Sequence, residues 1–432
     1  MPKFKSLDLS VYLISLVLIL VPLYPKFPLL GVSGTFVAVR LEDFVIATVV
    51  GIWLTTRLRN LPQLLKLPIH RAILLYLGVG AAALFTGIFL SRTTTINQGL
   101  LHWVRRIEYL SLFFIGFDFL KTKAQVAYLT RVFILVSLAV ALYGLGQQFF
   151  GLPVISTTNT EFAKGLALTL GAGARINSTF AGHYDLAAYS VFPLLLILGL
   201  LMTDSRHKLP LLITGSLVYW TMLLSASRVT FAAFYLTAGL FILVMRKFSW
   251  LIPLAIVAII SVLATPQLLG RYRELITNHL FAVVPIARAQ AVDEQEADAL
   301  KPPLVPEDRS LNIRLNAEWP RAIRAVLKNP VFGTGYSSIG LAVDNDYLRA
   351  LAETGLLGLA AFGLVILRFL KSSLPYLKSP PRRFEHVFIA AVTFGLVGLL
   401  LNAVFIDVFE ASKVAIITWT LLGITEKLKT IA

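Results

Sequence analysis

Repeated uncharged apolar runs of about twenty residues are the feature that most restricts the fold of this chain. A run of this length can cross roughly 30 Å of hydrocarbon as a helix. Lipid offers backbone amides and carbonyls no hydrogen-bond partner, so a membrane-crossing segment must be a helix or part of a closed β-barrel. Barrel strands are about ten residues long and alternate in polarity, unlike these runs. The sequence therefore predicts an all-α, polytopic membrane helix bundle.

Apolar length and flanking charge predict about twelve spans. They lie near residues 10–30, 41–56, 71–91, 99–120, 124–149, 185–203, 209–225, 229–246, 248–265, 347–370, 384–404 and 409–426. Basic residues cluster in every second connection, which marks the cytoplasmic side, so both termini are predicted to be cytoplasmic. The long connections at 150–184 and 266–346 are then extracytoplasmic. The first run lacks a small-residue cleavage site and is interpreted as a retained anchor.

The larger of these connections divides the chain. The predicted parts are a bundle of nine spans at 1–265, a large extracytoplasmic loop at 266–346, and a bundle of three spans at 347–432. Within the loop, apolar residues at helical spacing predict amphipathic helices at 266–282 and near 310–327. The segment 287–308, rich in Ala, Glu, Asp and Pro, is predicted to be mobile.

Charge and cysteine content exclude several functions. The net charge of +16 comes from short basic clusters between apolar runs, so we expect no nucleic-acid partner. The absence of cysteine excludes disulfides, thiolate metal sites and thiol nucleophiles. No histidine spacing typical of a metal site is present, and neither is a phosphate-binding or dinucleotide-binding glycine motif. We therefore expect no metal and no cofactor.

Ionisable residues next to the predicted spans are expensive in lipid and often functional. Nearly all of them fall toward the predicted outer side: Arg40, Glu42, Asp43, Arg105, Arg106, Glu108, Arg228, Glu353, Asp407, Glu410 and Lys413. A proton-coupled transporter typically carries acidic residues near the midplane, so this one-sided distribution favours a site that faces outward. The alternative is that these residues extend to lipid headgroups.

Three arginines lie in separate predicted outer segments. Arg228 follows Ser-Ala-Ser in a tight turn, Arg175 lies among glycines, and Arg314 lies on the second amphipathic helix. A guanidinium binds phosphate in bidentate fashion, so three of them together would suit a diphosphate. Arg228 could instead contact a lipid headgroup, and Arg314 could lie on a solvated helix face. Asp344, at the start of the span near 347–370, could cap that helix.

Several segments together resemble the O-antigen ligase and polymerase superfamily. They are Arg175-Ile-Asn-Ser-Thr-Phe, Ser225-Ala-Ser-Arg228, Asn329-Pro-Val-Phe-Gly-Thr-Gly-Tyr336 and Asn345-Asp-Tyr-Leu-Arg-Ala-Leu-Ala-Glu-Thr-Gly-Leu-Leu-Gly358. Arg40-Leu-Glu-Asp43 is also similar to what these proteins carry. The resemblance covers most of the chain, and the last segment is its most specific part.

The resemblance implies a metal-independent glycosyltransferase of the bacterial cytoplasmic membrane. Such proteins move a glycan from undecaprenyl diphosphate to an acceptor glycan, glycolipid or protein on the outer face, among the membrane lipids. Arg175 and Arg228 would hold the diphosphate, with Arg314 in support. Asp344 stands where ligases usually carry a histidine that serves as the proposed base, and a carboxylate can take that role.

The change from histidine to Asp344 leaves the branch of the superfamily open between a lipopolysaccharide ligase, a ligase for another glycan and a polymerase. Asp407 would be a second carboxylate that orients the acceptor. The candidate substrate-binding residues are Arg314, Asn345, Tyr347, Glu353, Asp407, Arg40 and His183. The competing hypotheses are a membrane transporter of a small anion and a non-catalytic scaffold for envelope assembly.

Overall fold

The structure of the chain is a computed structural model. It describes residues 8–27, 29–31, 38–57, 65–155, 167–168, 174–203, 207–264, 313–340, 343–378 and 383–431. The helix predicted at 266–282 and the mobile segment predicted at 287–308 lie outside these residues. Helices account for most of what is described, so the all-α class is confirmed.

Each segment predicted as a span overlaps a helix, although some ends differ: the segment predicted at 10–30 is helical only to Leu23. These helices are α1 (Leu9–Leu23), α2 (Leu41–Arg57), α3 (Pro68–Phe85), α4 (Ile96–Asp118), α5 (Lys123–Phe149), α6 (His183–Thr203), α7 (Lys208–Leu224), α8 (Arg228–Val244), α9 (Leu251–Ala264), α13 (Asp346–Lys378), α14 (Phe384–Asn402) and α15 (Ser412–Ile431). Within the described ranges, five helices are long and apolar enough to cross a membrane: α3 with the turn that continues it to Leu90, α5, α6, α13 and α14. The count of about twelve spans stays a prediction.

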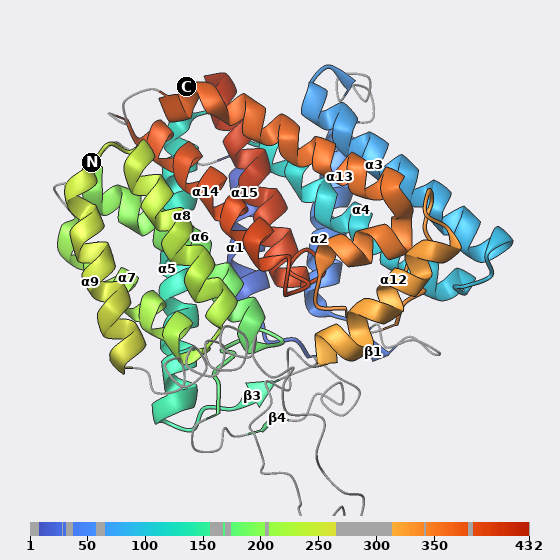
Figure 1. Ribbon diagram of the computed structural model, residues 1–432. Helices are drawn as coiled ribbons and strands as arrows, with labels where there is room; N and C mark the ends of the chain where they lie inside the picture. The colour runs from blue at the N-terminus through green and yellow to red at the C-terminus, as the bar shows by residue number, and fades with distance from the viewer. Residues whose placement is uncertain are drawn as a thin grey trace, which may run out of the picture.

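The remaining described elements are short. A helix predicted near 310–327 is present as a π-helical turn, η6 (Arg314–Glu318), that runs into α12 (Trp319–Lys328). A second π turn, η2 (Thr86–Leu90), extends α3, and a 3-10 turn, η4 (Phe248–Trp250), precedes α9. Two antiparallel pairs of two-residue strands join β1 (Leu30–Gly31) to β2 (Ala38–Val39) and β3 (Val154–Ile155) to β4 (Ala167–Leu168). Figure 1 shows β3, β4 and α12 along the lower edge of the bundle.

The last helix, α15, is the most deeply packed. Every residue from Ser412 to Glu426 is buried. The helix packs closely on α4, where a Cβ added at Gly423 would lie 2.1 Å from the Phe113 carbonyl oxygen. Small residues that let two backbones approach are typical of helix contacts in membranes. The other principal contacts join α13 to α3 and α14 to both α6 and α8.

The long helix α13 is broken at Gly355, where φ is 68° and ψ is −172°. The break frees backbone groups on both sides, and the preceding glycine-rich segment pairs with them. The amides of Thr334 and Gly335 donate to the carbonyls of Ala352 and Glu353 at 2.8 and 2.9 Å. Two further hydrogen bonds run from the amides of residues 356 and 357 to the carbonyls of residues 330 and 331, at 2.8 and 3.2 Å. The two most conspicuous motifs of the sequence therefore form one folded unit.

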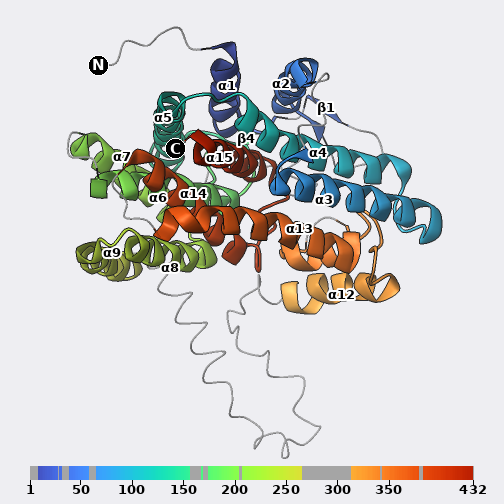
Figure 2. The ribbon, with the colours of Figure 1, turned by 90° about the horizontal axis from the view of Figure 1, so that it is seen from above.

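The segments at residues 22–27, 38–40, 174–182, 313–340, 343–345 and 403–411 gather at one end of the bundle, which we call the loop end. Lys413 at the start of α15 joins two of these segments, 22–27 and 174–182. Its Nζ donates to the carbonyls of Pro22, Tyr24 and Thr179 at 3.2, 2.6 and 2.7 Å. Viewed from above, α12 lies outside the bundle, beside the first part of α13 (Figure 2).

Candidate functional site

The residues just before α13 form a tight turn that two side chains hold. Asn345 caps the helix, because its Oδ1 accepts a hydrogen bond from the Leu348 amide at 2.9 Å. The carboxylate of Asp407 accepts hydrogen bonds from three consecutive amides at 3.4, 3.3 and 3.0 Å, those of Val343, Asp344 and Asn345. Asp344 has a φ of 49°, in the left-handed region that aspartate tolerates better than most residues. The helix-capping position is thus occupied by Asn345, and the Asp344 carboxylate is left for another contact.

An ion-pair network lies behind this turn. Arg349 donates from Nη2 to Asp407 Oδ2 at 2.7 Å and from Nη1 to Glu353 Oε1 at 3.3 Å. Glu353 Oε1 also accepts the Ser337 amide at 3.1 Å. Burial acts to raise the pKa of Asp407, but the Arg349 guanidinium and the turn amides bring this pKa below its ordinary value. Asp407 is therefore a fixed anion whose observed contacts hold the Asp344 turn in place.

Asp344 forms an ion pair with Arg314. Its Oδ2 accepts hydrogen bonds from Arg314 Nε at 3.1 Å and Nη2 at 2.8 Å. The Arg314 side chain is 6% exposed, whereas that of Asp344 is 32% exposed, so the carboxylate is the part of the pair that a substrate can reach. Burial raises the pKa of Asp344, the charge of Asp407 adds to the increase, and Arg314 opposes it. Among the described residues Oδ1 has no hydrogen-bond partner, which leaves it able to accept a proton.

Two of the three predicted arginines meet at the start of α6. Arg175 Nη1 lies 2.9 Å from Nε2 of His183. The Arg314 guanidinium lies over the ring of the next residue, Tyr184, 5.8 Å from its centroid. The rings of His183 and Tyr184 are 4.0 Å apart between centroids, so the two arginines approach one aromatic pair from separate segments.

The third arginine, Arg228, is the first residue of α8. Two residues later, the Thr230 hydroxyl donates to Asn402 Oδ1 at 2.6 Å. The next carbonyl, that of Ala403, accepts the Asp346 amide at 2.9 Å. These contacts place Arg228 at the loop end, on the side where α8 and α14 meet the beginning of α13. That all three arginines bind one ligand stays a prediction.

Two other predicted substrate-binding residues make packing contacts. The Tyr347 hydroxyl donates to the Leu400 carbonyl at 2.7 Å and so joins α13 to α14. Arg40 is 9% exposed, and its Nη1 lies 3.7 Å from Glu42 Oε1. The contact of either side chain with a substrate stays a prediction.

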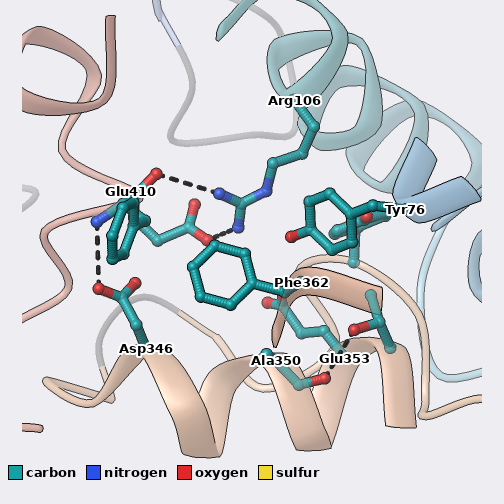
Figure 3. Close-up of a pocket in the computed structure, with 10 residues that line it drawn as sticks. Tyr76, Arg106, Asp346, Ala350, Glu353, Phe362 and Glu410 are labelled. Atoms are coloured by element: carbon teal, nitrogen blue, oxygen red, sulfur yellow. Dashed lines mark hydrogen bonds and ion pairs between the residues drawn. The ribbon is translucent and has the colours of Figure 1, made fainter. Parts of the chain in front are cut away.

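A polar cavity lies on the other side of the network, between α3, α4 and α13 (Figure 3). Its volume is about 340 Å³, which includes the part open to solvent. Arg106 crosses it, donating from Nη1 to the Phe409 carbonyl at 3.1 Å and pairing through Nη2 with Glu410. Asp346 accepts the Phe409 amide at 3.1 Å. The cavity thus combines an arginine and carboxylates with aromatic rings directly beside the Arg349 network.

Arg349 is the residue of this arrangement that the sequence reasoning missed. It lies inside the motif quoted for the resemblance, and its spacing of four from Glu353 is the available signal, because residues four apart are neighbours on a helix. Arg106 and Glu410 were recognised as outward-facing charges but were given no role. Their pairing joins α4 to the connection before α15, which no local pattern predicts.

Apolar helices long enough to cross a membrane, with the Arg314–Asp344 and Arg349–Asp407 ion pairs at the loop end, define an integral membrane protein with a charged site at that end. Residues 211–363 match the family model described as O-Antigen ligase. The match confirms the predicted resemblance to the O-antigen ligase and polymerase superfamily over this part of the chain. The match covers Arg228, Arg314 and the Asp344 turn, and it indicates glycan transfer of the ligase or polymerase type. No curated protein matches the chain.

Proposed function

We propose that this protein transfers a glycan from a polyprenyl diphosphate carrier to an acceptor sugar hydroxyl at the extracytoplasmic face of the bacterial cytoplasmic membrane. The acceptor would be a glycan or a glycolipid, and no metal ion would take part. The observation that carries the proposal is the Asp344 carboxylate. It is partly exposed, it is paired with Arg314, and its backbone amide is bound by Asp407, in the part of the chain that matches this family.

The reaction needs a base and a stabilised leaving group. The acceptor oxygen attacks the anomeric carbon of the donor, and its proton passes to Asp344. The bond from that carbon to the diphosphate oxygen breaks, and its electron pair leaves with the polyprenyl diphosphate. Arg175 and Arg228 would bind the diphosphate and stabilise the charge that develops on it, because fixed positive groups can replace a metal ion in this task. Arg314 would support them and hold Asp344.

The proposed orientation follows from charge. Basic residues flank the helix ends opposite the loop end, for example Arg246 after α8 and Lys371 and Lys378 within α13. Such residues are typical of cytoplasmic connections. The loop end would then face outward, where a glycan carried on polyprenyl diphosphate is available for transfer.

Replacing Arg228 with alanine tests the diphosphate assignment. We expect kcat/KM for transfer from a purified lipid-linked oligosaccharide to fall by about 10²–10³-fold, because a fixed donor to the developing charge is lost. The matched control is Arg246→Ala, which removes an exposed arginine at the opposite end of the same helix and should retain near wild-type turnover. Near-normal turnover in a folded Arg228→Ala protein would show that this arginine does not bind the leaving group.

A further inference from the structure

The π turn η6 places two side chains on the face that lines the candidate site. It closes with a hydrogen bond from the Trp319 amide to the Arg314 carbonyl. In a turn of this kind, residues four and five apart lie on one face, so Glu318 shares the face of Arg314. Arg314 uses that face to bind Asp344. π turns are rare in proteins overall, but many of those that occur lie at functional sites. This one brings a second carboxylate, that of Glu318, toward Asp344.

Electrostatics agree with that placement. Burial raises the pKa of Glu318 above its ordinary value, and the charge of Asp344 is the next largest contribution in the same direction. Asp407 adds a smaller contribution, whereas Arg314 acts to lower the pKa. Glu318 therefore lies within electrostatic reach of Asp344, Asp407 and Arg314.

Glu318 and Trp319 each carry a buried polar atom that needs a partner. Glu318 Oε2 and Trp319 Nε1 are buried although both residues are partly exposed, and neither atom has a hydrogen-bond partner in the part of the chain that the structure describes. Buried polar atoms are nearly always hydrogen-bonded, so two adjacent exceptions require an explanation. The Trp319 ring is packed 6.1 Å from that of Phe405, which restrains its orientation.

The chemistry of these two atoms selects the ligand group. An ionised carboxylate oxygen only accepts hydrogen bonds, and an indole nitrogen only donates. A hydroxyl group suits either atom, since it can donate to the carboxylate oxygen and accept from the indole N–H. A diphosphate does not suit the pair, because its charge is repelled by Glu318. On η6, Arg314 is thus suited to bind an anion, whereas Glu318 and Trp319 are suited to bind uncharged hydroxyl groups.

We propose that Glu318 and Trp319 bind hydroxyl groups of the sugar that meets Asp344 during transfer. This inference rests on the proposed function and specifies where the glycan, as distinct from the diphosphate, contacts the protein. Both the donor and the acceptor bring a sugar to Asp344, so the common ligand is a sugar hydroxyl.

The test is equilibrium binding of the full-length purified protein to three probes. They are undecaprenyl diphosphate without a glycan, the lipid-linked oligosaccharide purified from the source cells, and the surface glycolipid of those cells as acceptor. Trp319→Phe keeps the ring beside Phe405 and removes the N–H group, and Glu318→Gln removes the charge at nearly constant shape. Arg324→Gln, on the exposed side of α12, is the control for changes to this helix.

We expect each variant to weaken binding of one glycan-bearing probe by roughly 5–20-fold, the size of one lost hydrogen bond. Binding of the bare carrier should stay within about twofold, and Arg324→Gln should match the wild type. The probe affected identifies the donor or the acceptor as the source of the hydroxyl. Unchanged binding of both glycan-bearing probes, or equal weakening of the bare carrier, would overturn the inference. Failure of the wild type itself to bind either glycan-bearing probe would instead refute the proposed function.

Discussion

Asp344→Asn is expected to lower kcat for glycan transfer by about 10²–10⁴-fold, the usual contribution of a general base. The asparagine side chain keeps the size of the carboxylate and can still accept from Arg314, but it cannot take the acceptor proton. Affinity for the lipid-linked donor should therefore change little. Single-turnover rates and donor binding, measured on the same purified protein, separate the two quantities.

Asn345→Ala is the matched control, because Asn345 caps α13 and Asp344 does not. Loss of a cap costs about 0.5–2 kcal/mol of stability, so this variant should unfold at lower temperature while retaining a larger share of its turnover. A parallel fall of donor affinity and kcat in Asp344→Asn would mean that Asp344 is structural.

The pH dependence of turnover follows from the same assignment. A base works only when deprotonated, and burial raises the pKa of Asp344 above the ordinary aspartate value. The wild-type kcat should accordingly decline as the pH falls through that raised pKa, at a higher pH than an exposed aspartate would give. The acidic limb should be absent from the residual activity of Asp344→Asn.

Gly355→Ala is expected to reduce the free energy of unfolding by on the order of 3 kcal/mol, the range of the largest single-residue backbone effects. The backbone at Gly355 (φ 68°, ψ −172°) lies in a region that only glycine adopts readily. An added Cβ would also stand 2.2 Å from the Val331 carbonyl oxygen and 2.6 Å from the Gly333 amide nitrogen. The glycine-rich segment would have to separate from α13.

Gly363→Ala is the control within the same helix. A Cβ at Gly363 meets nothing within 4 Å, and its backbone is helical. Alanine should there be neutral or stabilise the helix by up to about 1 kcal/mol. Thermal unfolding of the two purified variants in the same detergent compares them directly. Equal unfolding temperatures would show that the break at Gly355 contributes nothing to the fold.

The existence and approximate positions of the helices were predictable from the sequence, because apolar length and flanking charge locate each one. The segment predicted at 209–225 is the helix Lys208–Leu224, and that predicted at 384–404 is Phe384–Asn402. The break in α13 was not predictable in the same way. The apolar pattern continues through Glu-Thr-Gly-Leu-Leu-Gly, and the break depends on hydrogen bonds to residues 330–335, which periodicity cannot show.

The sequence predicted which residues belong to the candidate site better than it predicted the contacts between them. The excess of outward charges and the arginines in separate segments identified Arg314, Asp344 and Asp407 as members. The sequence left Asp344 open between a base and a cap. The answer depends on which side chain, Asn345 or Asp344, turns toward the amides of the helix. It also depends on Asp407, which binds the amides of the turn although it lies more than sixty residues further along the chain. Contacts of this kind arise from packing of α13 on α14 and α15.

Measurement of both products of a single reaction is the most direct test of glycan transfer by this protein. The purified protein would be incubated with lipid-linked oligosaccharide and the surface glycolipid of the source cells, with a chelator present to remove metal ions. We predict that glycosylated acceptor and free polyprenyl diphosphate appear in equal amounts and that Asp344→Asn slows both together. Absence of both products from a preparation that still binds the donor would contradict the assignment of this protein as a glycosyltransferase.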